Sequence, residues 1–117
     1  MSSKVVILTS DNFDALALAA DRTTVVDFWA PWCPPCRALA PTIEALAEER
    51  TDIVVGKLDV DDHPAIAERY GIQSIPTVLI FRNGELASRS IGLVPIERLR
   101  DLLDRTVEAT ASSIVGG

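Results

Sequence analysis

The chain has 117 residues, of which 48% are hydrophobic, and this composition suits a single compact domain with a buried core. Its formal net charge of −6 argues against a nucleic-acid partner, which requires a basic surface. No apolar run approaches the roughly 20 residues that cross a bilayer, and neither a signal-peptide pattern nor a lipidation motif is found. We therefore expect a cytoplasmic protein without a membrane partner.

Apolar runs and helical spacing predict nine elements along the chain. Strands are expected at residues 5–8, 25–29, 53–60, 77–81 and 85–91. Helices are expected at residues 13–20, 35–50, 64–70 and 95–107. This order, βαβαβαββα, is typical of an α/β fold with a central mixed sheet flanked by helices. We assign residues 1–108 to one domain and expect residues 109–117, which are small and patternless, to form a flexible tail.

Prolines and glycines predict several of the element boundaries. Pro34 precedes Pro35 and is therefore biased away from the helical region, so we expect the second helix to begin at Pro35. Gly71 is a suitable stop for the third helix. Asn83 and Gly84 predict a tight hairpin turn between the last two strands.

The two cysteines of the chain, Cys33 and Cys36, are separated by only two residues. A bridge between them closes a very small loop and constrains little of the unfolded chain, so its purpose is more plausibly chemical than structural. Cys33 precedes a helix, where free backbone N–H groups and the helix dipole favour a thiolate. Cys36 lies about one turn further in, and we expect it to be less exposed. This arrangement predicts that Cys33 attacks a substrate disulfide and that Cys36 then resolves the mixed disulfide.

Other uses of a C-x-x-C motif are tested by the remaining residues. A structural zinc site needs about four ligands, and beyond the two cysteines the chain offers only the distant His63. Attachment of a c-type haem requires His directly after the second cysteine, where this chain has Arg37. Redox chemistry remains, and we expect no metal and no bound cofactor.

The residues Trp29-Ala30-Pro31-Trp32-Cys33-Pro34-Pro35-Cys36 resemble the active-site segment of the thioredoxin family, in a WCPPC variant. Further segments occur at the spacing of that family, and the resemblance covers roughly residues 4 to 105. These segments are residues 25–29, Pro41, 57–61, 70–72, 75–77, 81–84 and Gly92. The resemblance implies a thioredoxin fold that reduces protein disulfides and is recharged by a thioredoxin reductase, usually an NADPH-linked flavoprotein. Nothing in the sequence suggests an obligate oligomer, so we expect a monomer.

The resemblance also implies roles for residues outside the cysteine motif. Ile75 and Pro76 look like the family's cis-proline bond, which faces the cysteines and pairs with the substrate backbone. Asp27 resembles the buried carboxylate that handles the proton of the second cysteine, and Lys57 resembles its neighbour. The residues alone already predict a raised pKa for Asp27, because an unpaired carboxylate is costly to bury.

A set of apolar or small residues is expected to bind substrate around the cysteines. The set comprises Trp32, Pro34, Pro35, Ile75, Pro76, Gly92 and Leu93. For Trp32, which flanks the attacking thiol, we favour docking over packing; Trp29, inside a strand sequence, is expected in the core.

Two residues depart from the family pattern and leave alternatives open. Pro34 replaces the usual Gly, and Leu93 is bulkier than the common small residue. Since residues between the cysteines tune the reduction potential, a thiol oxidase or isomerase is one alternative to the reductase. A non-enzymatic binding subunit that docks through the apolar surface is another.

Overall fold

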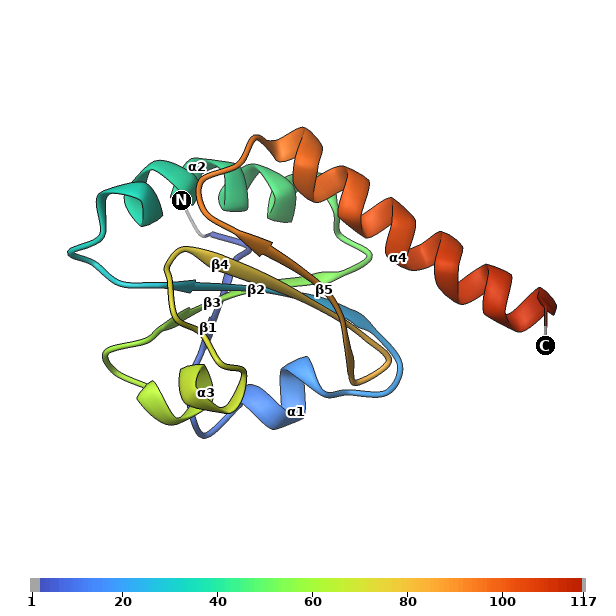
Figure 1. Cartoon of the computed structure of the whole chain (residues 1–117), viewed down its shortest axis with the longest axis horizontal. Helices are drawn as coiled ribbons and strands as arrows, with labels where there is room; N and C mark the ends of the chain where they lie inside the picture. Colours follow the sequence, from blue (N-terminus) through green and yellow to red (C-terminus); the bar gives the residue numbers. More distant parts are fainter. Residues whose placement is uncertain (1–2, 117) are drawn as a thin grey trace.

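The computed structural model describes the fold of residues 3–116 and the side chains of residues 3–106. The strands are β1 (Val6–Leu8), β2 (Thr23–Trp29), β3 (Val54–Asp59), β4 (Thr77–Arg82) and β5 (Glu85–Ile91). The helices are α1 (Phe13–Ala17), α2 (Pro34–Glu49), α3 (Pro64–Arg69) and α4 (Ile96–Gly116). The predicted order βαβαβαββα is confirmed (Figure 1).

The five strands form one mixed sheet in the order β1-β3-β2-β4-β5. β3 pairs in parallel with both β1 and β2, whereas β4 runs antiparallel to β2 and to β5. β2 therefore lies at the centre of the sheet, and Asp27 on it stands between Lys57 of β3 and Val78 of β4. The predicted α/β fold class is confirmed.

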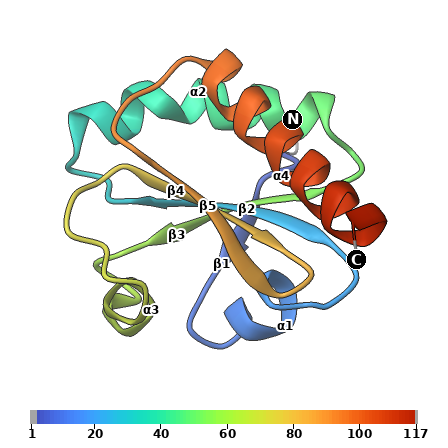
Figure 2. The same cartoon turned by 45° about the vertical axis from the view of Figure 1, so that its right-hand side comes forward.

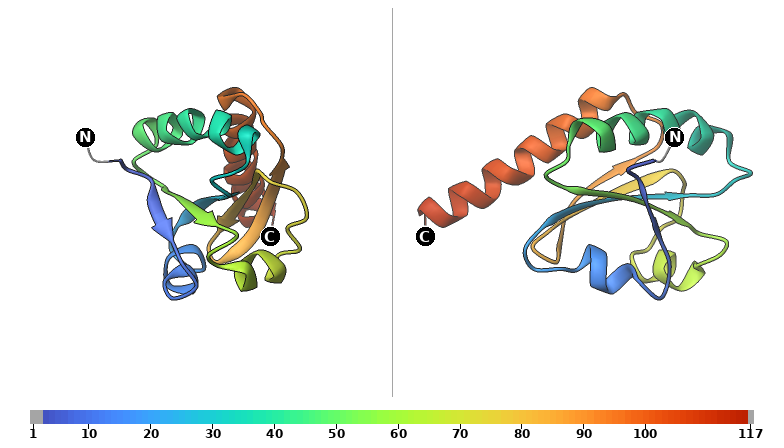
Figure 3. Two further views of the ribbon diagram at one scale, coloured as in Figure 1. Left: turned by 90° about the vertical axis from the view of Figure 1, so that its left-hand side faces the viewer. Right: turned by 180° about the vertical axis from the view of Figure 1, so that it is seen from behind.

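Helices cover both faces of the sheet, α2 and α4 on one side and α1 and α3 on the other (Figures 1 and 3). Successive side chains of a strand point to opposite faces. Accordingly Val25 belongs to the core cluster that includes Leu39 of α2, and Val26 belongs to the cluster that includes Phe13 of α1. This double covering explains why β2 has a nearly continuous apolar sequence.

The start of α2 differs from the prediction by one residue. The helix begins at Pro34, and Cys33 is its N-cap residue with φ −90° and ψ 109°. The expectation that Pro34 stays extended was wrong. Both Pro34 and Pro35 fit the first turn, because the N–H groups that they lack would have no partner inside the helix. Cys33, which also precedes a proline and was expected to be extended for that reason, does have the extended conformation.

The contact between α1 and the β4–β5 turn shows why α1 is shorter than predicted. Asn83 and Gly84 have φ values of 53° and 83°, as the predicted hairpin turn requires. A Cβ atom on Gly84 would lie 2.7 Å from the carbonyl oxygen of Leu18, the C-cap of α1. The N–H of Asn83 also donates to the carbonyl of Arg22 at 3.0 Å. The chain after Ala17 is therefore shaped by this turn rather than by its own helical spacing, and β2 begins earlier than expected.

Helix α4 continues to Gly116, beyond the end expected near residue 107, and its last turns extend past the sheet (Figures 1 and 2). The first glycine after its start is Gly116, and no proline follows Pro95, so no strong helix breaker interrupts it earlier. The division into residues 1–108 and a flexible tail stays a prediction. Over the part of the chain that the structure describes, no helix is both long and apolar enough to cross a membrane.

Candidate active site

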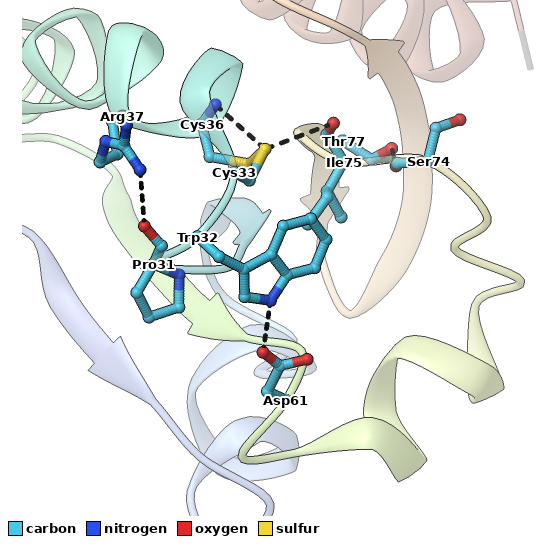
Figure 4. Close-up of a disulfide and its surroundings, with 9 residues drawn as sticks. All are labelled: Pro31, Trp32, Cys33, Cys36, Arg37, Asp61, Ser74, Ile75 and Thr77. Atoms are coloured by element: carbon cyan, nitrogen blue, oxygen red, sulfur yellow. Dashed lines mark hydrogen bonds between the residues drawn. A yellow bond between two sulfur atoms is a disulfide. The ribbon is translucent and has the colours of Figure 1, made fainter.

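Cys33 and Cys36 form a disulfide at the N-terminus of α2, where their Cα atoms are 5.2 Å apart (Figure 4). Cys33 is the N-cap residue and Cys36 lies in the first turn, so the helix itself brings the sulfurs together. Cys33 is 3% exposed and Cys36 is 1% exposed. Cys36 is the less exposed of the two, as predicted, but in this oxidised state Cys33 is nearly as buried as Cys36.

The first turn of α2 aims a single main-chain donor at the sulfur of Cys33. The N–H of Cys36 donates to Sγ of Cys33 at 3.3 Å. Pro34 and Pro35 carry no N–H, so Cys36 supplies the first amide of the helix that can do so. A thiolate at Cys33 is therefore stabilised by this N–H and by the positive end of the helix dipole.

The segment before β4 lies opposite the cysteines. The Ile75–Pro76 peptide bond is cis, as the resemblance implied, and the carbonyl oxygen of Ile75 lies 3.7 Å from Sγ of Cys33 (Figure 4). The N–H of Gly92 donates to the carbonyl of Pro76 at 2.8 Å. The fold thus brings together three regions that are far apart in sequence.

Asp27 is the buried carboxylate of the site. It is 3% exposed, and its Oδ1 atom has no hydrogen-bond partner among the described residues. Burial raises its pKa to about 7, and the positive charge of Lys57 on the neighbouring strand opposes that rise. The ammonium of Lys57 lies 5.0 Å from the centre of the Trp29 ring, and this contact fixes it beside the site.

Asp27 and Cys36 line the same cavity of about 140 Å³. Since a water molecule takes about 30 Å³ of liquid volume, the cavity has room for water that can pass a proton. Its remaining lining residues are Val5, Trp29, Arg37, Ala40, Ile43, Glu44 and Lys57. Trp29, expected in the core, is half-buried and forms part of this wall.

Trp32 lies on the surface beside the disulfide, with 63% of it exposed. Its indole N–H donates to Oδ2 of Asp61 at 2.6 Å (Figure 4). Next to it, Nη1 of Arg37 donates to the carbonyl of Pro31 at 3.0 Å. The sequence reasoning missed both roles. No local pattern marks the bond between Trp32 and Asp61, which are 29 positions apart, and none marked the bond of Arg37 to the carbonyl of Pro31.

Exposed apolar side chains surround the disulfide. Leu93 is 54% exposed and adjoins Gly92, which is bonded to Pro76. Ile75 is half-buried against the cysteines, and Pro34 and Pro35 are exposed at the start of α2. The predicted substrate-binding residues therefore lie around one site, and their role in binding stays a prediction.

No cluster of three or more His, Cys, Asp or Glu side chains suited to a metal ion occurs within the described residues. His63, the alternative ligand considered above, instead accepts a hydrogen bond from the N–H of Ser10 at 3.1 Å.

Known proteins resemble the chain over most of its length. The sequence profile of the family described as Thioredoxin matches residues 4–105. "Thioredoxin M5, chloroplastic" of Oryza sativa subsp. japonica is 45% identical over 107 residues, which are 91% of this chain and 62% of the rice protein. "Thioredoxin" of Porphyra purpurea is 44% identical over 101 residues, 86% of this chain and 94% of that protein. "Thioredoxin" of Buchnera aphidicola subsp. Acyrthosiphon pisum is 39% identical over 106 residues, 90% and 98% of the two chains. The chain thus spans less than two thirds of the rice protein and nearly all of the other two.

A mixed sheet that presents a cysteine pair at a helix N-terminus, opposite a cis-proline loop, defines a site for dithiol–disulfide exchange. With the family match over residues 4–105 and these relatives, the chain belongs to the thioredoxin family.

Proposed function

We propose that the chain is a thiol–disulfide oxidoreductase that reduces disulfide bonds of protein substrates. The observation that carries the proposal is the Cys33–Cys36 disulfide at the start of α2, beside an exposed apolar surface and the carbonyl of Ile75. The relatives named thioredoxin support it.

The reaction follows from the order of the two cysteines along α2. In the reduced protein, the Cys33 thiolate attacks one sulfur of the substrate disulfide, and the other substrate sulfur leaves as a thiolate and takes up a proton. Cys36 then loses its proton and attacks Sγ of Cys33. The Cys33–Cys36 disulfide forms, the second substrate sulfur leaves and is protonated, and two electrons have passed to the substrate.

Asp27 is proposed to accept the proton of Cys36. The two residues line one cavity, and a pKa of about 7 lets the carboxylate both take and return a proton near neutral pH. Lys57, whose charge lowers the pKa of Asp27, is proposed to hold it in this range. Asp27 and Lys57 have these proposed roles when the cysteines are reduced, because Cys36 carries a proton only in that state.

The partners and setting are proposed as follows. The oxidised protein is recharged by a thioredoxin reductase, an NADPH-linked flavoprotein, and needs no cofactor of its own. It acts as a monomer. Its compartment is a reducing one, the cytoplasm, because both of its cysteines serve the exchange site and neither is used for a structural disulfide. The names of two relatives place those proteins in chloroplasts, so a chloroplast is the alternative compartment, with reducing partners of that compartment.

One observation favours a second candidate function. Pro34 sits at the first position of α2, between the two cysteines. Because the residues between the cysteines tune the potential of the pair, a thiol oxidase or isomerase is the candidate that competes with the reductase.

The proposal is tested by turnover of insulin disulfides. The wild-type protein should reduce insulin with dithiothreitol or a thioredoxin reductase as the electron source, and the Cys33→Ser, Cys36→Ser double variant should not. If the wild-type protein reduces insulin with neither of these electron sources, the proposal is contradicted. A double variant that retains full biological function would instead support the non-enzymatic binding subunit.

A further inference from the structure

The segment between α3 and β4, residues 71–76, carries Ile75 opposite the disulfide. We infer that Arg89, on the edge strand β5, is a positioning residue for this segment. Its Nη2 atom donates to the carbonyl oxygen of Tyr70, directly before the segment begins, at 2.8 Å. The inference rests on the proposed function, because it concerns how the same site holds a protein substrate.

The carbonyl that Arg89 binds is one that α3 leaves without a helical partner. Tyr70 is the C-cap of α3, and the last carbonyls of a helix need partners from outside it. The Tyr70 ring is fixed against Phe81 and Phe13, with ring centres 5.3 and 5.6 Å away. Gly71 then has φ +63°, and nothing lies within 4 Å of the place where a Cβ atom would be. The Tyr70–Gly71 peptide plane is held from the α3 side by the N–H of Gly71, which donates to the carbonyl of Glu68 at 3.0 Å, and from the β5 side by the guanidinium of Arg89.

The end of β5 also fixes the far end of the segment. The N–H of Gly92, the residue after β5, donates to the carbonyl of Pro76 at 2.8 Å. Arg89 and Gly92 are three residues apart, so one short stretch of edge strand binds both ends of residues 71–76. Between these ends, Gln73 and Ser74 are exposed and Ile72 and Ile75 are half-buried. The N–H of Ile72 donates to the carbonyl of Ala67 at 3.0 Å.

The consequence concerns the carbonyl of Ile75, which lies 3.7 Å from Sγ of Cys33. Without the Arg89 bond, the start of the segment keeps only its two bonds to α3, so the main chain that receives the substrate is held less firmly at this distance from the attacking sulfur. A protein substrate that pairs with the segment should then bind less well. A small disulfide that needs only the sulfur should be affected little.

The test compares Arg89→Ala, Arg89→Lys and a matched control, Arg98→Ala, which removes an exposed arginine on α4. We expect Arg89→Ala to lower kcat/KM for insulin by roughly 3- to 10-fold, the worth of one exposed hydrogen bond, mainly through KM. Its rate with the small aromatic disulfide 5,5′-dithiobis(2-nitrobenzoic acid) should stay within about 2-fold of the wild type, since no segment contact is involved. For Arg89→Lys, which retains a charged donor, kcat/KM for insulin should lie between the values of Arg89→Ala and the wild type. Arg98→Ala should match the wild type.

Hydrogen exchange at the amides of residues 72–75 gives a readout that does not depend on activity. Exchange should be faster in Arg89→Ala than in the wild type and unchanged in Arg98→Ala. Unchanged exchange in Arg89→Ala, or an equal loss of rate with insulin and the small disulfide, would overturn the inference. Failure of the wild type to reduce insulin would overturn the proposed function instead, and the exchange result would still decide whether Arg89 holds the segment.

Discussion

The sulfur of Cys33 lies 3.7 Å from the carbonyl oxygen of Ile75, although the two residues are 42 positions apart in the sequence. Cys33 is placed by the N-terminus of α2 and Ile75 by the segment before β4. A substrate main chain alongside Ile75 would therefore hold its own sulfur near the atom that attacks it. This relationship, together with the cysteine pair, is the basis for proposing a protein disulfide as the substrate of the site.

The different positions of the two cysteines predict different trapping behaviour. Cys36→Ser should form a long-lived mixed disulfide between Cys33 and a protein substrate, because the resolving thiol is absent. Cys33→Ser should form little or none, because the sulfur that receives the Cys36 N–H and lies opposite the carbonyl of Ile75 belongs to Cys33. Non-reducing electrophoresis followed by mass spectrometry of the joined peptides measures both. If the mixed disulfide forms faster on Cys36 than on Cys33, the roles assigned to the two cysteines are reversed.

The raised pKa of Asp27 predicts a pH-dependent loss of stability. Its pKa is about 7 in the folded protein and near 3.8 in an unfolded chain, so the folded state binds the additional proton between these values. The free energy of unfolding should therefore fall as pH rises from about 4 to about 7, by at most about 4 kcal/mol from this group.

Asp27→Asn removes the titrating group and should be the more stable protein above pH 7. This advantage should shrink as pH falls toward 4. Urea unfolding of the oxidised proteins at several pH values measures it, with Asp62→Asn, an exposed carboxylate, as the control. An advantage that is the same at pH 4 and pH 8 would mean that ionisation of Asp27 is not its cause.

The charge of Lys57 should hold down the pKa of Asp27. Lys57→Met removes a positive charge that lowers this pKa, so the carboxyl should titrate above pH 7. Titration of the Asp27 carboxyl carbon by NMR gives the value directly. Lys4→Met is the control, since Lys4 pairs with Glu48 on the surface at 3.7 Å. A downward shift, or equal shifts in both variants, would contradict the role of Lys57.

The hydrogen bond from Trp32 to Asp61 should orient the indole, which we propose contacts the protein substrate. Asp61→Ala removes the acceptor at 2.6 Å and should raise KM for insulin a few-fold, while Asp61→Asn keeps an acceptor and should have a smaller effect. The effect is expected to be modest, because Trp32 is 63% exposed and exposed bonds are worth about 1 kcal/mol. Equal KM values for all three proteins would show that Trp32 needs no such support.

The sequence predicted the order of elements because their signals are local. The apolar run of β2, the turn at Asn83 and Gly84, and the helix stop at Gly71 depend on neighbouring residues, and each appears in the structure. One error was local, since α2 begins at Pro34 with Cys33 as its N-cap, and another arose where distant residues decide. The end of α1 depends on the contact between Gly84 and Leu18, which the helical spacing of α1 does not reveal.

The sequence predicted several residues that the structure brings together, but few of their contacts. Cys33 and Cys36 form a disulfide, Pro76 follows a cis bond in the facing segment, and Asp27 lines the cavity of Cys36, while their roles stay predictions. The bonds of Arg89 to Tyr70 and of Trp32 to Asp61 join side chains to partners far away in the sequence. Arginine and aspartate on exposed loops or edges usually have no such role, so their residue types alone gave no signal.

The reduction potential of the Cys33–Cys36 pair tests the central claim most directly. Equilibration with dithiothreitol buffers, followed by tryptophan fluorescence, is suitable because Trp29 packs against the cysteines and Trp32 precedes Cys33. A protein-disulfide reductase predicts a potential below about −250 mV. A potential above about −180 mV would contradict the account and mean that Pro34 has made the pair an oxidant or isomerase.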